Sequence, residues 1–326
     1  GNIGTTYGVL PSDIASAQAL SLFNDQVSAT YYNPAALAKD PRGELTTGLM
    51  HAEHELRAKS LGGADAPIRN GDVLQDSPSQ QILLGMKTDL TSLTQYNHPI
   101  YFGLMLGVEK YGEEMLAFKS ENSREGQFFN YGRQPLFLNL GGGIELANGI
   151  TSGASAHISL RSDAKLVASA DLSGETQYEE LNVTAKPVIR PVLSINFEWD
   201  EVFCGKEDCG IWTGLETAFA FRGHTEARTS VESNLTIPGT VIDPGITVLI
   251  DTIDSYQPDI FSAGILYHFS DNFRAAVTVE QQNWNDLEDE LARDTVKDQA
   301  FATFKDIVVP RVGAEWTVNE HLILSA

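Results

Sequence analysis

From residue 80 onward, segments of about ten residues alternate apolar side chains with polar or small ones. A clear example has apolar residues at Leu136, Leu138, Leu140, Ile144 and Leu146, with Asn139, Gly141, Gly143 and Glu145 at positions of the opposite parity. Successive residues of a β-strand face opposite sides, so each segment would form a strand with one apolar and one polar face. The alternation therefore predicts an all-β protein.

About eleven strands can be placed from this pattern. They cover residues 43–56, 79–89, 99–109, 134–146, 150–162, 187–199, 210–222, 259–270, 273–284, 304–317 and 321 onward. Tight turns at Ser270–Asn272 and Val318–Glu320 alternate with long polar loops at 110–133, 223–258 and 285–303. A soluble β-sandwich also alternates, but strands of about 9–13 residues and this turn pattern are typical of outer-membrane barrels.

The distribution of aromatic and charged residues bears on the same choice. Aromatic residues stand near strand ends, where a membrane interface would lie, at Trp199, Tyr267, Phe269 and Trp316. The polar faces carry Arg161, Arg190, Arg222, Arg274 and Arg311 together with Glu145, Glu198, Glu216, Glu280 and Glu315. Charges buried in a lumen must pair, so we expect a salt-bridge lattice there rather than a catalytic cluster. These features favour a transmembrane antiparallel β-barrel over a sandwich.

Composition removes some classes of function. The formal net charge is −22, which argues against nucleic-acid binding. No stretch approaches the roughly 18 apolar residues of a membrane-spanning helix. Cys204 and Cys209 enclose a short polar loop, where a metal site would need further ligands. We favour a disulfide at a periplasmic turn over a metal site, and we expect no cofactor.

The first 42 residues do not alternate. Ser12 and Asp13 precede a predicted helix over 14–23, and Asn33 is a suitable N-cap for a later helix that has Pro34 at its first position. A globule ahead of a barrel suggests a plug inside the lumen. We therefore expect an N-terminal hatch, residues 1–42, and a transmembrane β-barrel, residues 43–326.

The hatch sequence is similar to that of the FadL/TodX family, outer-membrane transporters of long-chain fatty acids and hydrocarbons. The similarity runs through Ala15, Gln18 and Ala19 and then from Asp25 to Ala38. It includes the Asn-Pro-Ala signature, matched here by Asn33, Pro34 and Ala35. Further similarity lies in Gly43–Ala52, Phe102–Gly112, Gln282–Trp284 and Phe304–Asp306, so the resemblance covers essentially the whole chain.

The family resemblance implies a barrel of about fourteen strands. His321–Ala326 would then stop within a strand, and a closed barrel cannot leave such an edge in lipid. We therefore expect about three further strands beyond Ala326. The resemblance also implies a monomer in the bacterial outer membrane.

The same resemblance implies a passive channel for fatty acids or hydrocarbons. Ligand would bind in the lumen beside Gly1, Asn2 and Ile3. It would leave sideways into the membrane through a gap at a kink in the third strand, matched here by Glu109, Lys110, Tyr111 and Gly112. Glu109 and Lys110 are charged where the family has small polar residues. Arg161 and Lys165 are candidates to pair with a fatty-acid carboxylate, and an uncharged alkane or aromatic ligand stays open as the alternative.

Two other functions compete with transport. An outer-membrane enzyme would need a nucleophile and a base, but His51, His54 and His157 lack a recognisable Ser or Asp frame. A structural or adhesin-like barrel would not need the Asn-Pro-Ala hatch. We expect the acidic run Asp286–Asp298 to be a solvated loop that cations could bridge to lipopolysaccharide.

Overall fold

The computed structural model describes residues 3–53, 78–110, 136–170, 176–205, 209–237, 241–293, 303–319 and 322–326, with some strand residues defined by their backbone alone. The strands are β1 (Glu44–Ala52), β2 (Ser79–Asp89), β3 (Ile100–Lys110), β4 (Leu136–Ala147), β5 (Ile150–Ala170), β6 (Thr176–Glu198), β7 (Leu215–Arg222), β8 (Thr225–Ile237), β9 (Val241–Gln257), β10 (Ile260–Ser270), β11 (Phe273–Gln282), β12 (Ile307–Asn319) and β13 (Leu322–Ser325). The helices are α1 (Ile3–Thr6), α2 (Pro11–Ala15), α3 (Ala29–Tyr32), η1 (Pro34–Ala38), η2 (Thr91–Leu93), α4 (Trp199–Cys204), η3 (Gly210–Trp212) and α5 (Asp286–Ala292). Within these residues, no helix is both long enough and apolar enough to cross a bilayer.

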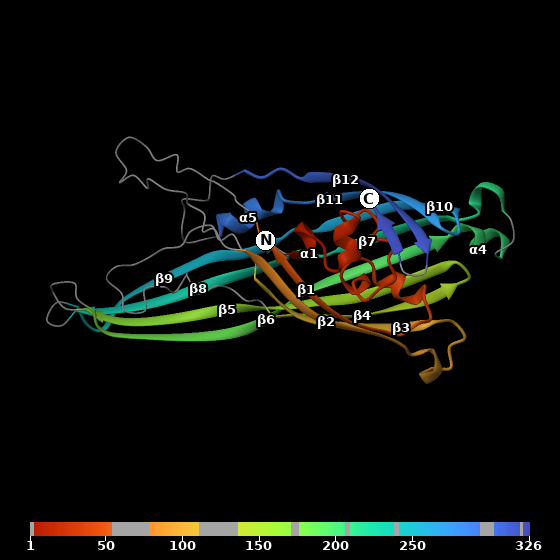
Figure 1. Cartoon of the computed structure of the whole chain (residues 1–326). Coiled ribbons are helices and arrows are strands. Elements are labelled where there is room, and N and C mark those ends of the chain that lie inside the picture. The colour runs from red at the N-terminus through yellow and green to blue at the C-terminus, as the bar shows by residue number, and fades with distance from the viewer. Residues whose placement is uncertain are drawn as a thin grey trace.

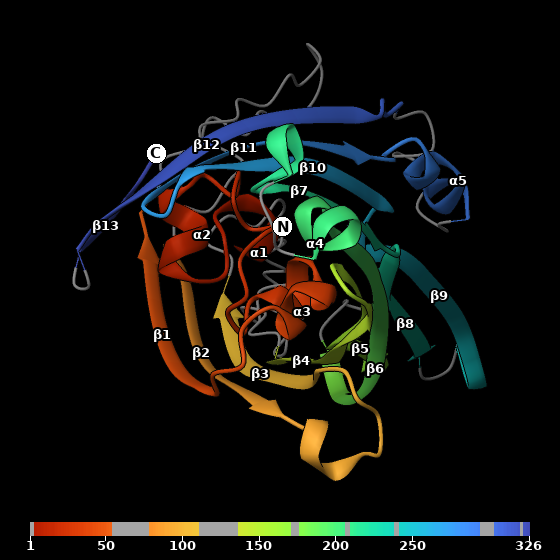
Figure 2. The same ribbon diagram turned by 90° about the vertical axis from the view of Figure 1, so that its right-hand side faces the viewer.

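The strands belong to one curved sheet whose order is β1-β2-β3-β4-β5-β6-β7-β10-β11-β12-β13. Neighbours along this path pair antiparallel, and the β8–β9 hairpin attaches to β5 through a parallel pairing. Figure 2 shows the sheet curling around the N-terminal residues, with β1 and β13 on the same side of the view. In the described part of the chain, no pairing joins β1 to β13. The sheet therefore forms most of a barrel wall.

Each of the eleven predicted strands is present, but the loop predicted at 223–258 is wrong. That stretch forms β8 and β9, and β5 and β6 extend to 21 and 23 residues. Figure 1 shows these four strands reaching well beyond the other strands at one end of the molecule. The predicted start of β7 at residue 210 is also too early, because α4 and η3 occupy the connection after β6.

The acidic run after β11 is another correction, because its first part is a helix and not a solvated loop. In α5, Leu287 and Leu291 lie four residues apart and are buried against Tyr256. The amide of Phe304 donates a hydrogen bond to Glu288 Oε1 at 2.6 Å and holds the returning chain against this helix. The two leucines at helical spacing thus hold α5 against β9, although the acidic composition of this segment suggested only exposure to solvent.

The wall exposes its apolar face and buries its polar face. On β6, Ile189 is 59% exposed while the adjacent Arg190 is 1% exposed. Large apolar side chains point outward along the sheet at Leu45, Leu49, Ile82, Leu193, Phe219, Ile265, Val277 and Val312. A soluble sandwich would do the reverse, because burial of apolar area stabilises it. The burial pattern is therefore that of a wall facing lipid, as the alternation predicts.

Inside the curve, several of the predicted charges pair, whereas Arg190 donates to the carbonyls of Gly223 and Pro258. Arg222 Nη2 lies 2.5 Å from Glu280 Oε2, and Arg311 Nη1 lies 3.6 Å from the same oxygen. Arg274 Nε lies 3.0 Å from Glu315 Oε1. The Arg222–Glu280 pair reaches across β10, and the other two pairs join the neighbouring strands β11 and β12, so together they satisfy charges that would otherwise be costly to bury.

Residues Ile3–Ala38, here called the plug, pack inside the curve of the sheet (Figure 2). The helix predicted over 14–23 is wrong, because α2 ends at Ala15 and the backbone turns at Ala17 and Gln18, with φ of 47° and 66°. Asp13 joins the parts of this turn: its side chain accepts hydrogen bonds from the Leu10 amide at 2.9 Å and from Ser21 Oγ at 2.7 Å. The plug is thus folded by local polar contacts and not by one long helix.

Candidate ligand pathway and plug site

The Asn-Pro-Ala triplet touches the wall directly. Asn33 Nδ2 donates to Asn196 Oδ1 on β6 at 2.7 Å and to the Leu22 carbonyl at 2.5 Å. The Ala35 amide donates to Ser194 Oγ at 2.8 Å. Asn33 occupies the N-cap position of η1, as expected, but its side chain makes no capping hydrogen bond. It instead ties two parts of the plug to the wall.

The wall beneath the triplet has glycine where a side chain would collide. A Cβ atom at Gly143 of β4 would lie 2.5 Å from the Pro34 carbonyl oxygen. At Gly153 of β5 it would lie 2.3 Å from the Ala35 amide nitrogen. Close contacts of a built Cβ with the plug also occur at Gly85, Gly103, Gly264 and Gly313. Glycine inside a strand often marks such a close approach of another backbone. These glycines form the part of the wall that the plug contacts, here called the floor of the plug.

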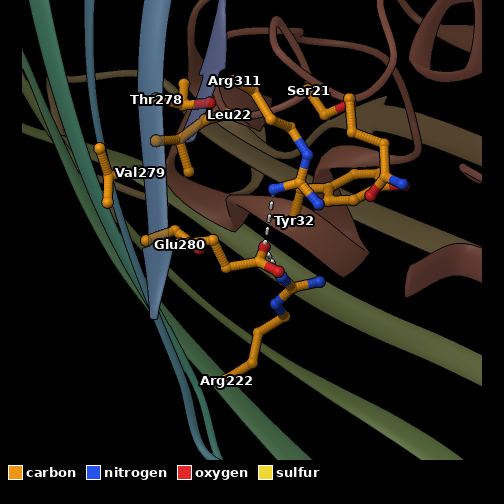
Figure 3. Close-up of a pocket in the computed structure, with 10 residues that line it drawn as sticks. Ser21, Leu22, Tyr32, Arg222, Thr278, Val279, Glu280 and Arg311 are labelled. Carbon is orange, nitrogen blue, oxygen red and sulfur yellow. Dashed lines mark hydrogen bonds and ion pairs between the residues drawn. The ribbon is translucent and has the colours of Figure 1, made fainter. Parts of the chain in front are cut away.

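Two plug tyrosines lie against a buried arginine of the wall, and Figure 3 shows one of them, Tyr32, beside Arg222. The Tyr31 and Tyr32 ring centroids are 5.2 and 5.7 Å from Arg222 Cζ, within range of a cation–π interaction. Arg222 is held in turn by Glu280. A cavity of about 20 Å³ lies among Gln18, Ser21, Tyr32, Arg222, Glu280 and Arg311. It has room for about one water molecule, so it forms part of the plug attachment and is too small for a hydrocarbon.

The C-terminal end of the plug is anchored by charge. Lys39 pairs with Glu216 of β7, and Glu216 also lies 2.8 Å from His268 Nε2 of β10. Burial by itself would lower the pKa of Lys39, but the carboxylates of Glu216 and Glu198 hold that pKa above its ordinary value. Lys39 is therefore a charged anchor where the chain passes from plug to wall.

Asp13, in the N-terminal half of the plug, is fully buried. Burial raises the pKa of this carboxyl above its ordinary value of 3.8, although hydrogen bonds from Ser21, Leu10 and Asn24 oppose the rise. The plug therefore contains an acidic group whose ionised form is disfavoured by its surroundings.

The predicted gate residues lie only partly within the described chain. Glu109 is buried near the end of β3, and its carboxylate accepts a backbone hydrogen bond from Ile3. The β2–β3 pairing continues to Gln80–Lys110, and the β3–β4 pairing is described as far as Val108–Leu136, where the described part of β4 begins. The structure thus brings one predicted ligand-contact residue to one predicted gate residue, near the end of β3.

Other predicted residues are placed less completely. Gly1, Asn2, Tyr111 and Gly112 lie outside the described residues. Arg161 and Lys165 belong to β5, where their backbone positions pair with Lys186 and Asn182 of β6. Cys204 and Cys209 form the expected disulfide, between α4 and η3.

Sequence reasoning missed the contribution of the wall to the plug site. The inward parity of Gly143 is visible in the sequence, but nothing in one sequence says which backbone approaches it. The Tyr31 and Tyr32 contacts with Arg222 join residues from opposite parts of the chain. His157 is placed by packing between Tyr31 and Phe137 and by a hydrogen bond with Asn139.

Comparison with known proteins adds the remaining evidence. The chain is 49% identical to the alkane uptake protein A of Marinobacter nauticus over 327 aligned residues, which are 98% of this chain and 71% of that protein. A Pseudomonas aeruginosa FadL homologue of known structure aligns with a TM-score of 0.52 and 13% identity, over 94% of this chain and 76% of that one. No family model matches the sequence. At so low an identity, the structural match speaks only for the fold.

Proposed function

Because the chain belongs to the FadL/TodX family of outer-membrane transporters, we propose that it admits alkanes across the outer membrane by passive diffusion. The observation that carries the choice of substrate is the 49% identity to an alkane uptake protein over nearly the whole chain. A wall with an apolar outer face and a plug in its lumen supports a channel over a purely structural barrel.

The proposed path begins in the lumen beside the first residues of the plug and leaves near the end of β3. Glu109 and Ile3 meet at this end of the strand. We infer that Glu109, Lys110, Tyr111 and Gly112 border a lateral opening and that Gly1, Asn2 and Ile3 contact the ligand. The transfer of an alkane into water costs about 0.8 kcal/mol of free energy per methylene group. A sideways exit into lipid avoids that cost.

Whether uptake depends on the basic residues Arg161 and Lys165 distinguishes an alkane from a fatty acid as the substrate. An alkane has no carboxylate, so its uptake should not depend on Arg161 or Lys165. A fatty acid would gain a charge-assisted hydrogen bond from either side chain. In the proposed alkane channel, replacing both residues with glutamine leaves alkane uptake unchanged.

The direct test is uptake of radiolabelled hexadecane by cells that lack their own alkane channel and express the full-length protein. We expect uptake well above that of cells carrying an empty vector. The same cells given labelled oleate measure preference for a fatty acid. Equal uptake with and without the protein, at normal outer-membrane levels, would exclude the channel.

A plug variant separates transport from folding. Changing Asn33, Pro34 and Ala35 together to glycine removes the bond to Asn196 and the fixed backbone of Pro34. We expect hexadecane uptake to be lost, while the barrel still inserts and keeps its heat-modifiable mobility on gels. Near-normal uptake would mean that the triplet has no part in the pathway.

The remaining partners follow from the same proposal. We propose that the protein acts as a monomer, has no enzymatic activity, and contacts lipopolysaccharide through the acidic segment Asp286–Asp298. Size measurement in detergent tests the first point, since a monomer gives the mass of a single chain plus its micelle.

A further inference from the structure

A ladder of aromatic rings leaves the wall at the end of β6. Phe197 stacks on Trp199 with 5.2 Å between ring centroids, and Trp199 stacks on Phe203 at 5.6 Å. Trp212 closes the group, 5.2 Å from Phe203. We call these four rings the aromatic clasp. It takes no part in the lumen or in the plug site.

The clasp continues the outer, lipid-facing side of the wall. Phe197 has the same strand parity as Leu193, which is 54% exposed on that side. Trp199 Nε1 donates to Thr217 Oγ1 at 3.1 Å, and Thr217 is the strand partner of Phe197 in β7. The rings therefore extend the apolar outer surface past the ends of the two strands.

The outer part of the clasp has little protein cover. Phe203 is 57% exposed, and Ile211, the neighbour of Trp212, is 75% exposed. The Cys204–Cys209 disulfide joins the helix that carries Phe203 to the turn that carries Trp212. Grouped apolar side chains that remain exposed mark an interaction surface, and the disulfide restricts how far these can move apart.

The position of the clasp identifies its partner. The Glu198 amide donates to the Gly149 carbonyl in the short β4–β5 turn, and the His268 amide donates to the Gly214 carbonyl beside the end of β10. Figure 1 shows α4 at this end of the molecule, opposite the long extensions of β5, β6, β8 and β9. In outer-membrane barrels the short turns face the periplasm, where the leaflet is phospholipid.

We propose that the aromatic clasp is a membrane anchor that inserts into the headgroup region of the periplasmic phospholipid leaflet. Tryptophan suits this depth because its ring is apolar while its N–H can still find a polar partner. The anchor would fix how deep and at what tilt this side of the wall sits, independently of what the channel carries.

Single-tryptophan variants test the anchor in phospholipid vesicles. The chain has 4 tryptophans, so Trp199→Phe, Trp284→Phe and Trp316→Phe together leave Trp212 as the sole emitter. A second variant keeps only Trp316, which is exposed on the outward face of β12, as a lipid-facing reference. We expect phospholipids brominated near the headgroup to quench Trp212 as strongly as Trp316, and acrylamide in the water to quench it weakly.

Heat-modifiable mobility shows whether each variant is folded before its fluorescence is interpreted. Strong acrylamide quenching of Trp212 without quenching by brominated lipid, in a folded protein, would overturn the proposal. Adding Cys204→Ser and Cys209→Ser should reduce lipid quenching of Trp212 and leave Trp316 unchanged. Unchanged Trp212 quenching would overturn the role given to the disulfide.

Discussion

Gly143 and Gly153 leave room for the backbone of Pro34 and Ala35 to lie directly on the barrel wall. Ser194 and Asn196 on the adjacent strand then supply the hydrogen bonds that fix this position. At the scale of single residues, plug docking thus combines the absence of side chains on two strands with polar side chains on a third.

Gly153→Ala should loosen the plug. The new methyl group collides with backbone atoms, which cannot move aside as a flexible side chain would, and such overpacking costs about 1–3 kcal/mol. We expect higher ion conductance in planar bilayers from a barrel of normal heat-modifiable mobility. Ala154→Val, one residue along and exposed on the outer face, is the matched control and should conduct like the parent. Equal conductance of all three proteins would contradict the tight fit.

Asp13 gives the plug a predicted pH dependence. Its pKa is raised in the folded state by burial, so the folded plug binds the proton more tightly than the unfolded chain. Plug stability should therefore fall as the pH rises from below 3.8, the ordinary value, to above the raised pKa. Asp13→Asn removes this charge and should make the plug amides exchange more slowly at about pH 7.

Near pH 3, where the parent carboxyl is protonated in both states, the difference between parent and Asp13→Asn should disappear. Hydrogen exchange followed by mass spectrometry on plug peptides, corrected for the intrinsic effect of pH, measures both conditions. Faster exchange of the variant at neutral pH would show that the carboxylate stabilises the plug.

Among the elements, β3 carries the predicted gate. Glu109, near the end of this strand, is buried and accepts a backbone hydrogen bond from Ile3 of the plug. We therefore propose that a ligand beside the first residues of the plug leaves the lumen at the boundary between β3 and β4.

A disulfide across this boundary should close the path. Val108 and Leu136 are strand partners on the outer face, and directly opposed residues have Cα atoms about 4.5–5.5 Å apart, which suits a disulfide. Val108→Cys with Leu136→Cys should lose hexadecane uptake when oxidised and regain it with a reductant. The same staple at Ile265 and Val277, also paired and outward, controls for cross-linking as such and should transport normally. Uptake by the oxidised β3–β4 staple would place the exit elsewhere.

At the scale of the whole molecule, the wall has an apolar outer face and a polar inner face, and this arrangement suits a protein surrounded by lipid. Side chains such as Leu49, 80% exposed, cover the outside of the wall, and paired charges such as Arg222 and Glu280 lie within. In water, the apolar outer face of the wall would be exposed, whereas a soluble protein buries its apolar side chains.

The protein should therefore fold only in detergent or lipid. Dilution from urea into detergent micelles should give a band that migrates faster unheated than boiled, as the compact barrel resists the gel detergent. Dilution into plain buffer should give aggregates, because the apolar outer face has no lipid to cover it. A monodisperse, β-rich species in plain buffer would exclude the membrane barrel.

The strands of the wall could be predicted well from the sequence, because a strand that faces lipid on one side alternates apolar and polar residues. β10 and β11, with Phe261 to Val279 alternating against polar residues, fall where expected. The segment Thr225–Ile237 has no run of alternating large apolar residues, so β8 was not found. The plug was located through a family resemblance, but its floor at Gly153 depends on a three-dimensional approach that no local pattern encodes.

The plug anchors also have a kinetic consequence. The hydrogen bond from Asn33 to Asn196 spans 163 residues of chain, and the one from Arg274 to Asn24 spans 250. The bond between Asp13 and Ser21 spans only 8. Local contacts form early and distant ones late, since long loops must close first. The plug can therefore compact soon after synthesis yet is seated only when β6 and β11 arrive, so assembly of the wall around it is the slow, committing step.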